Sequence, residues 1–153
     1  MSARGRQAAC HPIRCKLSRP MAKGFETNQE RKRALSAFGK DLARRAKSKC
    51  ELSHASGVPL VTYEVGPVPS EPEFERCLLI SEPVAGQLAK PSTLRPEEWR
   101  HLKDLIWSDI PPVQVMCVRL LRHFGNEQAW ARGILEEAYL DPDIEAWADE
   151  APL

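Results

Sequence analysis

The first regular pattern of apolar and polar residues begins at Thr27. The sequence Thr-Asn-Gln-Glu, which ends at Glu30, is typical of a capping box, in which each end satisfies an unpaired amide of the other. Apolar residues then recur at steps of three and four positions, and they are Leu35, Phe38, Leu42 and Ala46. Basic residues occupy most other directions, so this spacing predicts a basic amphipathic helix over residues 27–48.

A different pattern follows over residues 50–90. Residues 60–65 are rich in β-formers, and residues 77–80 make a second short apolar run. Between them, residues 66–75 carry three prolines and three glutamates, a composition that disfavours strand pairing and favours an exposed loop. We therefore expect a β-hairpin whose two strands are joined by a mobile loop.

The pattern over residues 95–149 is helical and is punctuated by prolines and one glycine. The expected helices span about 96–107, 111–124 and 126–139, followed by a fourth that starts from Asp141 with Pro142 in its first turn. The second of them has so few polar positions that it must be central to the core. Tryptophans fall one or two to a helix, as anchors of a common core would, and they are Trp99, Trp107, Trp130 and Trp147. A tryptophan cage for a ligand is the alternative.

These three patterns together predict a mainly α protein, in which a small β-hairpin packs on a bundle of about four to five helices. Residues 25–153 would form a single domain, preceded by a disordered basic tail over residues 1–24. A chain of 153 residues fits one domain of ordinary size. Its 42% hydrophobic and 28% charged residues are usual for a folded soluble protein.

Charge is distributed unevenly along the chain, although the net charge is only +1. Residues 1–49 hold 14 Lys or Arg against 3 Asp or Glu, a balance of +11, whereas residues 50–153 hold 8 against 18, a balance of −10. Clustered cations favour contact with nucleic acid or with an acidic protein. The candidate contact residues on the predicted basic helix are Arg31, Lys32, Arg33, Lys40, Arg44, Arg45 and Lys47. A solvated helix, one that docks on the acidic remainder of the chain, and one that lies on a membrane surface are the alternatives.

The sequence favours a cytoplasmic protein without a membrane span. No apolar run approaches the roughly 20 residues that cross a bilayer, and no apolar secretory core follows the arginine-rich start. That start fits a disordered tail better than a mitochondrial transit segment, and Met21 offers an alternative start of translation. An odd number of cysteines without the density of a disulfide scaffold suits a reducing compartment and predicts free thiols. They are Cys10, Cys15, Cys50, Cys77 and Cys117.

Short motifs in the hairpin and helical regions carry a resemblance to a known family. The first are Lys49-Cys50-Glu51-Leu52 and Leu60-Val61-Thr62-Tyr63-Glu64-Val65. The later ones are Trp99-Arg100, Trp107-Ser108, Ile110-Pro111, Val113-Gln114-Val115, Tyr139-Leu140-Asp141 and Ala146-Trp147-Ala148. Together they resemble the N-terminal domain of the PhnA family, which is named from an alkylphosphonate-utilisation operon. The resemblance covers roughly residues 30–149.

The resemblance implies a degenerate zinc site. Family members carry two Cys-x-x-Cys pairs that look like the knuckles of a zinc ribbon or treble clef; the first aligns with Cys50 and Ser53, and the second with Ser81 and Val84. Structural zinc needs four thiolate or imidazole donors, so we expect the site to be lost, with no cofactor. Packing must then stabilise the hairpin, through Val58, Leu60, Val61, Val65, Leu78 and Ile80. The alternative is a substitute metal site made by Cys50, His54 and Cys77.

No catalytic residue is expected, so the prediction is a non-enzymatic binding or structural module of unknown precise role. Tyr63 and Glu64 stand where a treble-clef nuclease would place its catalytic histidine, and a tyrosine is a poor general base at neutral pH. His101 and His123 fall on separate predicted helices as surface or boundary residues, and Cys117 reads as inert packing. An enzyme or accessory factor in phosphonate metabolism is one alternative function. A degenerate, nuclease-like treble clef that binds nucleic acid is the other.

Overall fold

A computed structural model describes residues 27–153 of the chain. The described residues divide into two units, of which the first holds residues 27–36 and the second is Ala37–Leu153. The described part of the first unit, residues 27–36, is helical. The predicted tail over residues 1–24 lies outside the described residues, as do Cys10 and Cys15. From residue 27 onward, no helix combines the length and the apolar character needed to cross a bilayer.

The predicted helix over residues 27–48 is interrupted and ends earlier than expected. Helical residues reach position 37, Phe38 forms a turn, and α2 then spans Gly39–Ala46. A glycine costs a helix conformational entropy, so Gly39 explains a break at this point. Lys47 and Ser48, with φ of 54° and 57°, take up left-handed conformations that end α2.

The predicted hairpin is confirmed. β1 (Leu60–Glu64) pairs antiparallel with β2 (Cys77–Ser81), and Thr62 lies opposite Leu79 at the centre. Every residue of β2 is buried, whereas those of β1 are half-buried, because β2 packs on both α2 and α5, the latter spanning Pro111–Gly125. The loop between the strands contains a 3-10 turn over Phe74–Arg76.

Most of the residues expected to stabilise the hairpin do pack in the core. Val65, Leu78 and Ile80 have no exposed surface, and Leu60 and Val61 are partly buried against them. The prediction was wrong for Val58, which is 38% exposed, because it lies in the bend before β1 rather than in the strand.

A helix that the sequence analysis did not predict follows β2 directly. α3 spans Glu82–Ala89, has a proline in its first turn, and buries Val84 and Leu88. Its eight residues give only two turns of apolar periodicity, and Gly86 lowers its helix propensity. α3 packs on both strands, so the hairpin is covered by helices at α2, α3 and α5.

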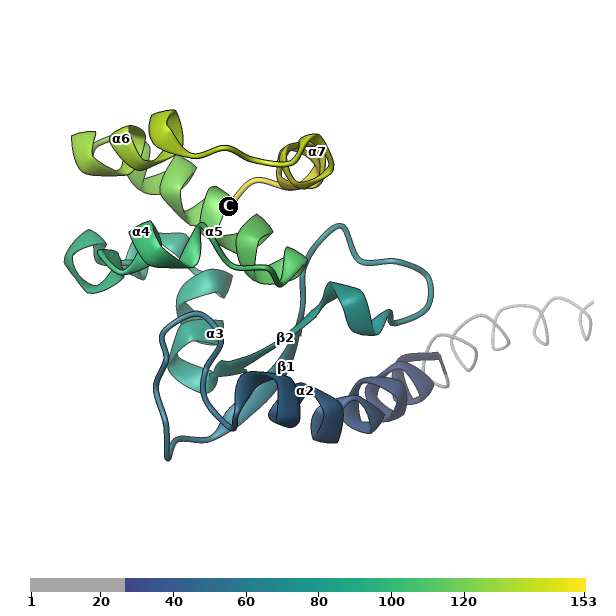
Figure 1. Ribbon diagram of the computed structural model, residues 1–153. Coiled ribbons are helices and arrows are strands. Elements are labelled where there is room, and N and C mark those ends of the chain that lie inside the picture. The colour runs from purple at the N-terminus through teal and green to yellow at the C-terminus, as the bar shows by residue number, and fades with distance from the viewer. Residues whose placement is uncertain (1–26) are drawn as a thin grey trace, which may run out of the picture. The chain divides into compact units, whose positions relative to one another are not determined.

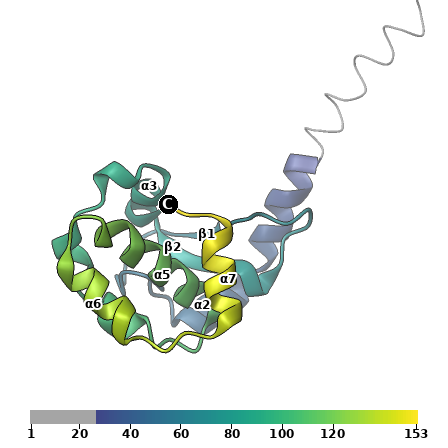
Figure 2. The same cartoon turned by 90° about the horizontal axis from the view of Figure 1, so that it is seen from above.

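α5 is the central helix of the second unit, as its apolar sequence predicted. α6 (Ala129–Glu137) and α7 (Pro142–Glu150) both pack on it. They lie on the side of α5 away from the hairpin (Figure 1), and the view from above shows them flanking α5 (Figure 2). α4 (Leu102–Leu105) also contacts α5, which completes a mainly helical fold around a small hairpin.

Three details of the helical block differ from the prediction or sharpen it. The helix expected over residues 96–107 is a 3-10 turn, Pro96–Trp99, followed by the short α4. Asn126 caps the C-terminal end of α5 instead of starting the next helix, because α6 begins after Gln128. Asp141 is confirmed as the cap of α7, since its carboxylate accepts a hydrogen bond from the N–H of Asp143 at 2.8 Å.

The four tryptophans do not all anchor the core. Trp99 is 2% exposed, and Trp130 and Trp147 are half-buried against the core. The prediction was wrong for Trp107, which is 60% exposed, because α4 ends before it.

A buried guanidinium joins distant segments within the second unit. Arg119 of α5 is 4% exposed, and its Nη2 donates to the carbonyl oxygens of Gly66 at 2.6 Å and Trp147 at 2.7 Å. Its Nε donates to the carbonyl of Ala148 at 3.3 Å, and the indole N–H of Trp147 reaches the Gly66 carbonyl at 3.1 Å. These bonds tie the chain after β1 to α7.

Candidate functional site

The loop after α2 wraps its backbone around a thiol. The N–H of Ser53 donates to Cys50 Sγ at 3.3 Å, and the N–H of His54 donates to the Cys50 carbonyl at 2.9 Å. His54 reaches this position with a left-handed φ of 61°. Residues 50–54 therefore make a tight reversal at the place where the PhnA resemblance implies a Cys-x-x-Cys pair, and we call them the knuckle loop.

The pKa of the Cys50 thiol lies below its ordinary value. Burial alone would raise the pKa of this thiol, but the Ser53 hydroxyl and the backbone N–H groups of Ser53, Ser81 and Leu52 lower it below the ordinary value. The Ser53 hydroxyl faces the sulfur without a hydrogen bond of ordinary geometry to any described residue. Cys117 is the opposite case: burial raises its pKa strongly, and its Sγ donates to the Leu102 carbonyl at 3.4 Å. Its predicted role as inert packing is consistent with both observations.

The four positions that align with the family's zinc ligands do not fit zinc. Cys50 and Ser53 lie before the hairpin, Ser81 ends β2, and Val84 lies in the first turn of α3. One thiol, two hydroxyl groups and an isopropyl group do not make the closed set of donors that structural zinc requires. Ser81 nevertheless contributes a backbone N–H near the sulfur of Cys50, so the start of α3 and the loop after α2 meet at this thiol.

The substitute metal site is not assembled either. Cys77 lies at the start of β2, whereas the N–H that approaches Cys50 belongs to Ser81 at its end. The sulfur of Cys77 donates instead to the Glu73 carbonyl at 3.2 Å. Across residues 27–153, no three or more His, Cys, Asp or Glu side chains are grouped so that they could hold a metal ion.

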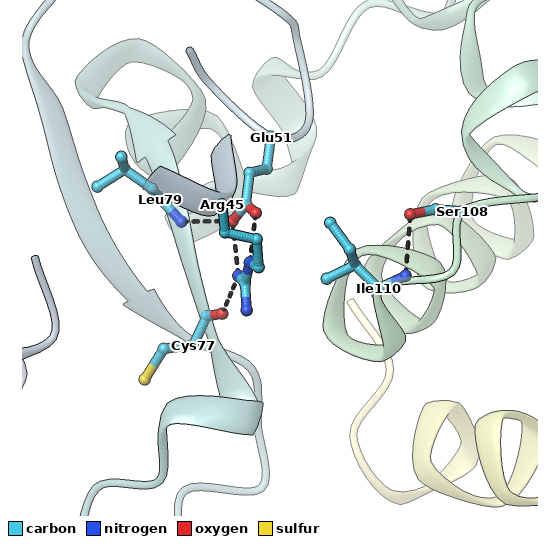
Figure 3. Close-up of polar contacts among 6 residues, drawn as sticks. All are labelled: Arg45, Glu51, Cys77, Leu79, Ser108 and Ile110. Carbon is cyan, nitrogen blue, oxygen red and sulfur yellow. Dashed lines mark hydrogen bonds and ion pairs between the residues drawn. The ribbon is translucent and has the colours of Figure 1, made fainter. Parts of the chain in front are cut away.

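An ion pair joins α2 to the knuckle loop and to β2 (Figure 3). Arg45 donates from Nε to Glu51 Oε1 at 2.8 Å and from Nη2 to Glu51 Oε2 at 2.9 Å. Glu51 Oε2 also accepts the N–H of Leu79 at 2.8 Å, and Arg45 Nη2 donates to the Cys77 carbonyl at 2.7 Å. The Arg45 guanidinium lies over the Phe74 ring, 5.2 Å from its centroid. We call this pair the Arg45–Glu51 clasp.

Its part in the clasp distinguishes Arg45 from the other residues that were predicted to contact a ligand. Its side chain is 20% exposed and is engaged inside the protein, so it does not present a free charge. Lys40 and Arg44 are four positions apart and lie on one exposed face of α2, and Lys47 is exposed at the C-cap that ends the helix. Lys49 is exposed just beyond them, and we call these four residues the cationic face.

Little of the charge on the cationic face is neutralised. Arg44 meets Asp41 at 3.7 Å, but both side chains are more than half exposed, and such pairs contribute little. Among the residues that the structure describes, Lys40, Lys47 and Lys49 have no ion-pair partner. The remaining predicted contact residues, Arg31, Lys32 and Arg33, belong to the first unit, where Lys32 and Arg33 are exposed.

A cavity of about 280 Å³ opens where α2 ends, and we call it the α2–α5 cavity. Its lining includes Lys47, Lys49 and His54 on one side and Ser108, Ile110 and Val113 on the other. Figure 3 shows the clasp and the Ser108–Ile110 turn, both of which contribute residues to the lining of the cavity. Ser108 Oγ accepts the N–H of Ile110 at 3.2 Å, which turns the chain into α5. The sequence analysis missed this cavity, because Lys49 and Ser108 are far apart in the chain and neither belongs to a recognisable motif.

The other residues that were considered for catalysis contact neighbouring parts of the fold. His101 is half-buried: its Nε2 lies 2.7 Å from the Leu52 carbonyl, and its ring stacks on Trp99 with centroids 5.6 Å apart. His123 is half-buried on α5, as expected of a boundary residue. Burial raises the pKa of Tyr63 against the opposing charge of Arg119, so still less of it is present near neutral pH as the phenolate that could act as a base. Comparison of the chain with protein-family models, with curated proteins and with solved structures gives no match.

Proposed function

We propose that this chain is a non-enzymatic, PhnA-like binding module that contacts nucleic acid through its basic helical region. The observation that carries the proposal is the cationic face, where Lys40, Lys47 and Lys49 are exposed without an ion-pair partner among the described residues. Residues 50–153 have a charge balance of −10, so this face concentrates positive charge on an otherwise acidic unit. Phosphate groups release counterions when such cations bind them, which makes nucleic acid the ligand that this surface fits best.

The order of elements supports the PhnA resemblance. Cys50 and Ser53 precede the hairpin, and Ser81 and Val84 lie at the start of the helix that follows it. A tight turn, a hairpin and a helix whose N-cap and first turn hold the second pair of positions are the parts of a treble clef. This order favours the second alternative, a degenerate treble clef that binds nucleic acid, which shares its ligand with our proposal. Packing and the Arg45–Glu51 clasp take over the cross-linking role of the metal.

The function in phosphonate metabolism rests on the family name, and it has a direct test. Purified protein would be incubated with phosphonates and added divalent metal ions, and release of inorganic phosphate would be measured. Release that a chelator abolishes would establish an enzyme and contradict the non-enzymatic proposal.

We also propose a cytoplasmic location, because the described cysteines are buried free thiols, as a reducing compartment allows.

Fluorescence anisotropy with labelled DNA and RNA tests the binding proposal. The logarithm of the binding constant should fall linearly with that of the salt concentration, by about 0.7 to 0.9 for each phosphate contacted. The variant Lys40→Gln/Arg44→Gln should bind more weakly than wild type. A matched variant, Lys90→Gln/Arg95→Gln, removes the same charges from exposed residues elsewhere and should bind like wild type. No binding of either nucleic acid at low salt would rule out the proposal and leave an acidic protein as the partner to test.

A further inference from the structure

The α2–α5 cavity lies where the cationic face ends. Lys40 lies in the first turn of α2 and Lys47 caps its C-terminal end, and the cavity opens at the Lys47 end. Its volume of about 280 Å³ is just below the range of about 300–1,000 Å³ typical of pockets for drug-sized ligands. The cavity therefore suits one small polar group of a larger ligand, or a small ion.

The side chains around the cavity favour an anion. Glu51 is neutralised by its two hydrogen bonds to Arg45, which leaves the ammonium groups of Lys47 and Lys49 as the net charge. The exposed imidazole of His54 adds a hydrogen-bond donor. Ser108 Oγ accepts the N–H of Ile110, so its hydroxyl proton can still be donated to a ligand.

The two helix ends near the cavity act unequally. Ile110 and Val113, at the N-terminal end of the 15-residue α5, line the cavity, and this end of a helix carries partial positive charge, although Pro111 and Pro112 have no N–H to donate to an anion. The C-terminal end of α2 would oppose an anion, but its last carbonyl groups already accept hydrogen bonds. Those of Ala43, Arg44 and Ala46 accept the N–H groups of Ser48, Lys47 and Lys49. The attraction for an anion therefore comes mainly from the ammonium groups of Lys47 and Lys49.

We infer that the α2–α5 cavity holds one phosphate group, bound by the ammonium groups of Lys47 and Lys49 with His54 and Ser108 as neighbouring donors. The inference rests on the proposed function, since the phosphate is one of a nucleic-acid backbone that continues along the cationic face. A free phosphate monoester is the other source of the same chemistry, and it would occupy the same cavity without the rest of α2.

Inorganic phosphate tests the cavity by itself. The ¹⁵N-labelled full chain would be titrated with phosphate against chloride at constant ionic strength, and amide shifts would be followed by NMR. Saturable shifts should centre on Lys49, His54 and Ser108, and the variant Lys47→Gln/Lys49→Gln should lose them. The matched variant Lys90→Gln/Lys103→Gln should keep them, and equal melting temperatures would show that both variants are folded. Shifts that are absent, that spread evenly over the surface, or that survive Lys47→Gln/Lys49→Gln would overturn the inference.

A single-stranded oligonucleotide separates this inference from the proposed function. Lys47→Gln/Lys49→Gln should reduce the salt dependence of binding by about one phosphate contact, and the matched variant should leave it unchanged. Binding that is insensitive to Lys47→Gln/Lys49→Gln but weakened by Lys40→Gln/Arg44→Gln would keep the proposed function and overturn the phosphate site. Phosphate bound in the cavity without any oligonucleotide binding would support the site, with a monoester as its ligand, and would end the nucleic-acid proposal.

Discussion

Replacing Glu51 with alanine should destabilise the protein more than any exposed charge deletion. The Glu51 side chain is 3% exposed, so its removal leaves the Arg45 guanidinium without its carboxylate and the Leu79 N–H without its acceptor. Breaking a buried pair from one side costs about 3–5 kcal/mol, and an unsatisfied buried N–H adds about 1 kcal/mol. Arg45 keeps 20% of its surface in water, which lowers the share of the pair to about 2 kcal/mol, so the total loss of unfolding free energy should be about 3 kcal/mol.

Urea unfolding followed by circular dichroism measures this loss. With a slope of about 1–3 kcal/mol per molar urea, the midpoint of Glu51→Ala should fall by about 1–3 M. Asp149→Ala is the control, because it breaks the Arg122–Asp149 pair, whose side chains are 41% and 67% exposed. That change should cost at most about 1 kcal/mol.

A double-mutant cycle shows whether the loss comes from the pair itself. Arg45→Met/Glu51→Met removes both charges together and should be more stable than the sum of its single changes predicts, by more than about 1 kcal/mol. Strict additivity, or a Glu51→Ala variant as stable as Asp149→Ala, would refute the view that the clasp replaces a metal cross-link.

Three further predictions concern the core and the helix ends. The folded pKa of Cys117 is raised, so above about pH 8.5 the unfolded chain loses a proton that the native protein keeps, and stability falls by up to about 1.4 kcal/mol per pH unit. Urea unfolding at pH 8 and pH 10 should therefore show a smaller alkaline loss for Cys117→Val; an equal loss would contradict the buried thiol. Asp141→Ala should cost about 1 kcal/mol in thermal unfolding, because α7 loses its cap, while a cost near zero would show that the cap is dispensable. Trp99→Ala should cost about 3–5 kcal/mol and Trp107→Ala less than about 0.5 kcal/mol, and equal costs would contradict their different burial.

The elements with complete periodicity were predictable from the sequence. α5 shows apolar residues in almost every direction, and the two strands are bounded by turn-forming residues, so both α5 and the hairpin emerge from pattern alone. α3 was missed because two turns with a proline and a glycine give too short a period to distinguish from a loop. The burial of Trp107 was predicted wrongly because it depends on the residue at which α4 ends, and helix propensity predicts the ends of helices poorly.

The candidate site was only partly predictable. The basic positions of α2 follow from charge and helical spacing, which is why Lys40, Arg44 and Lys47 were identified. The internal role of Arg45 was not, because it depends on the register that places Glu51 beside Leu79 of β2. A single sequence contains no information on that register.

The guanidinium of Arg119 has a consequence for motion. It donates hydrogen bonds to the carbonyl of Gly66, after β1, and to the carbonyls of Trp147 and Ala148 in α7. If either segment moves away from α5, water reaches the guanidinium and weakens its bonds to the other segment. Local opening of α7 should therefore release the chain around Gly66 in the same event. Amide protons of the two segments would then exchange with solvent as one cooperative group, although 81 positions separate Gly66 from Trp147.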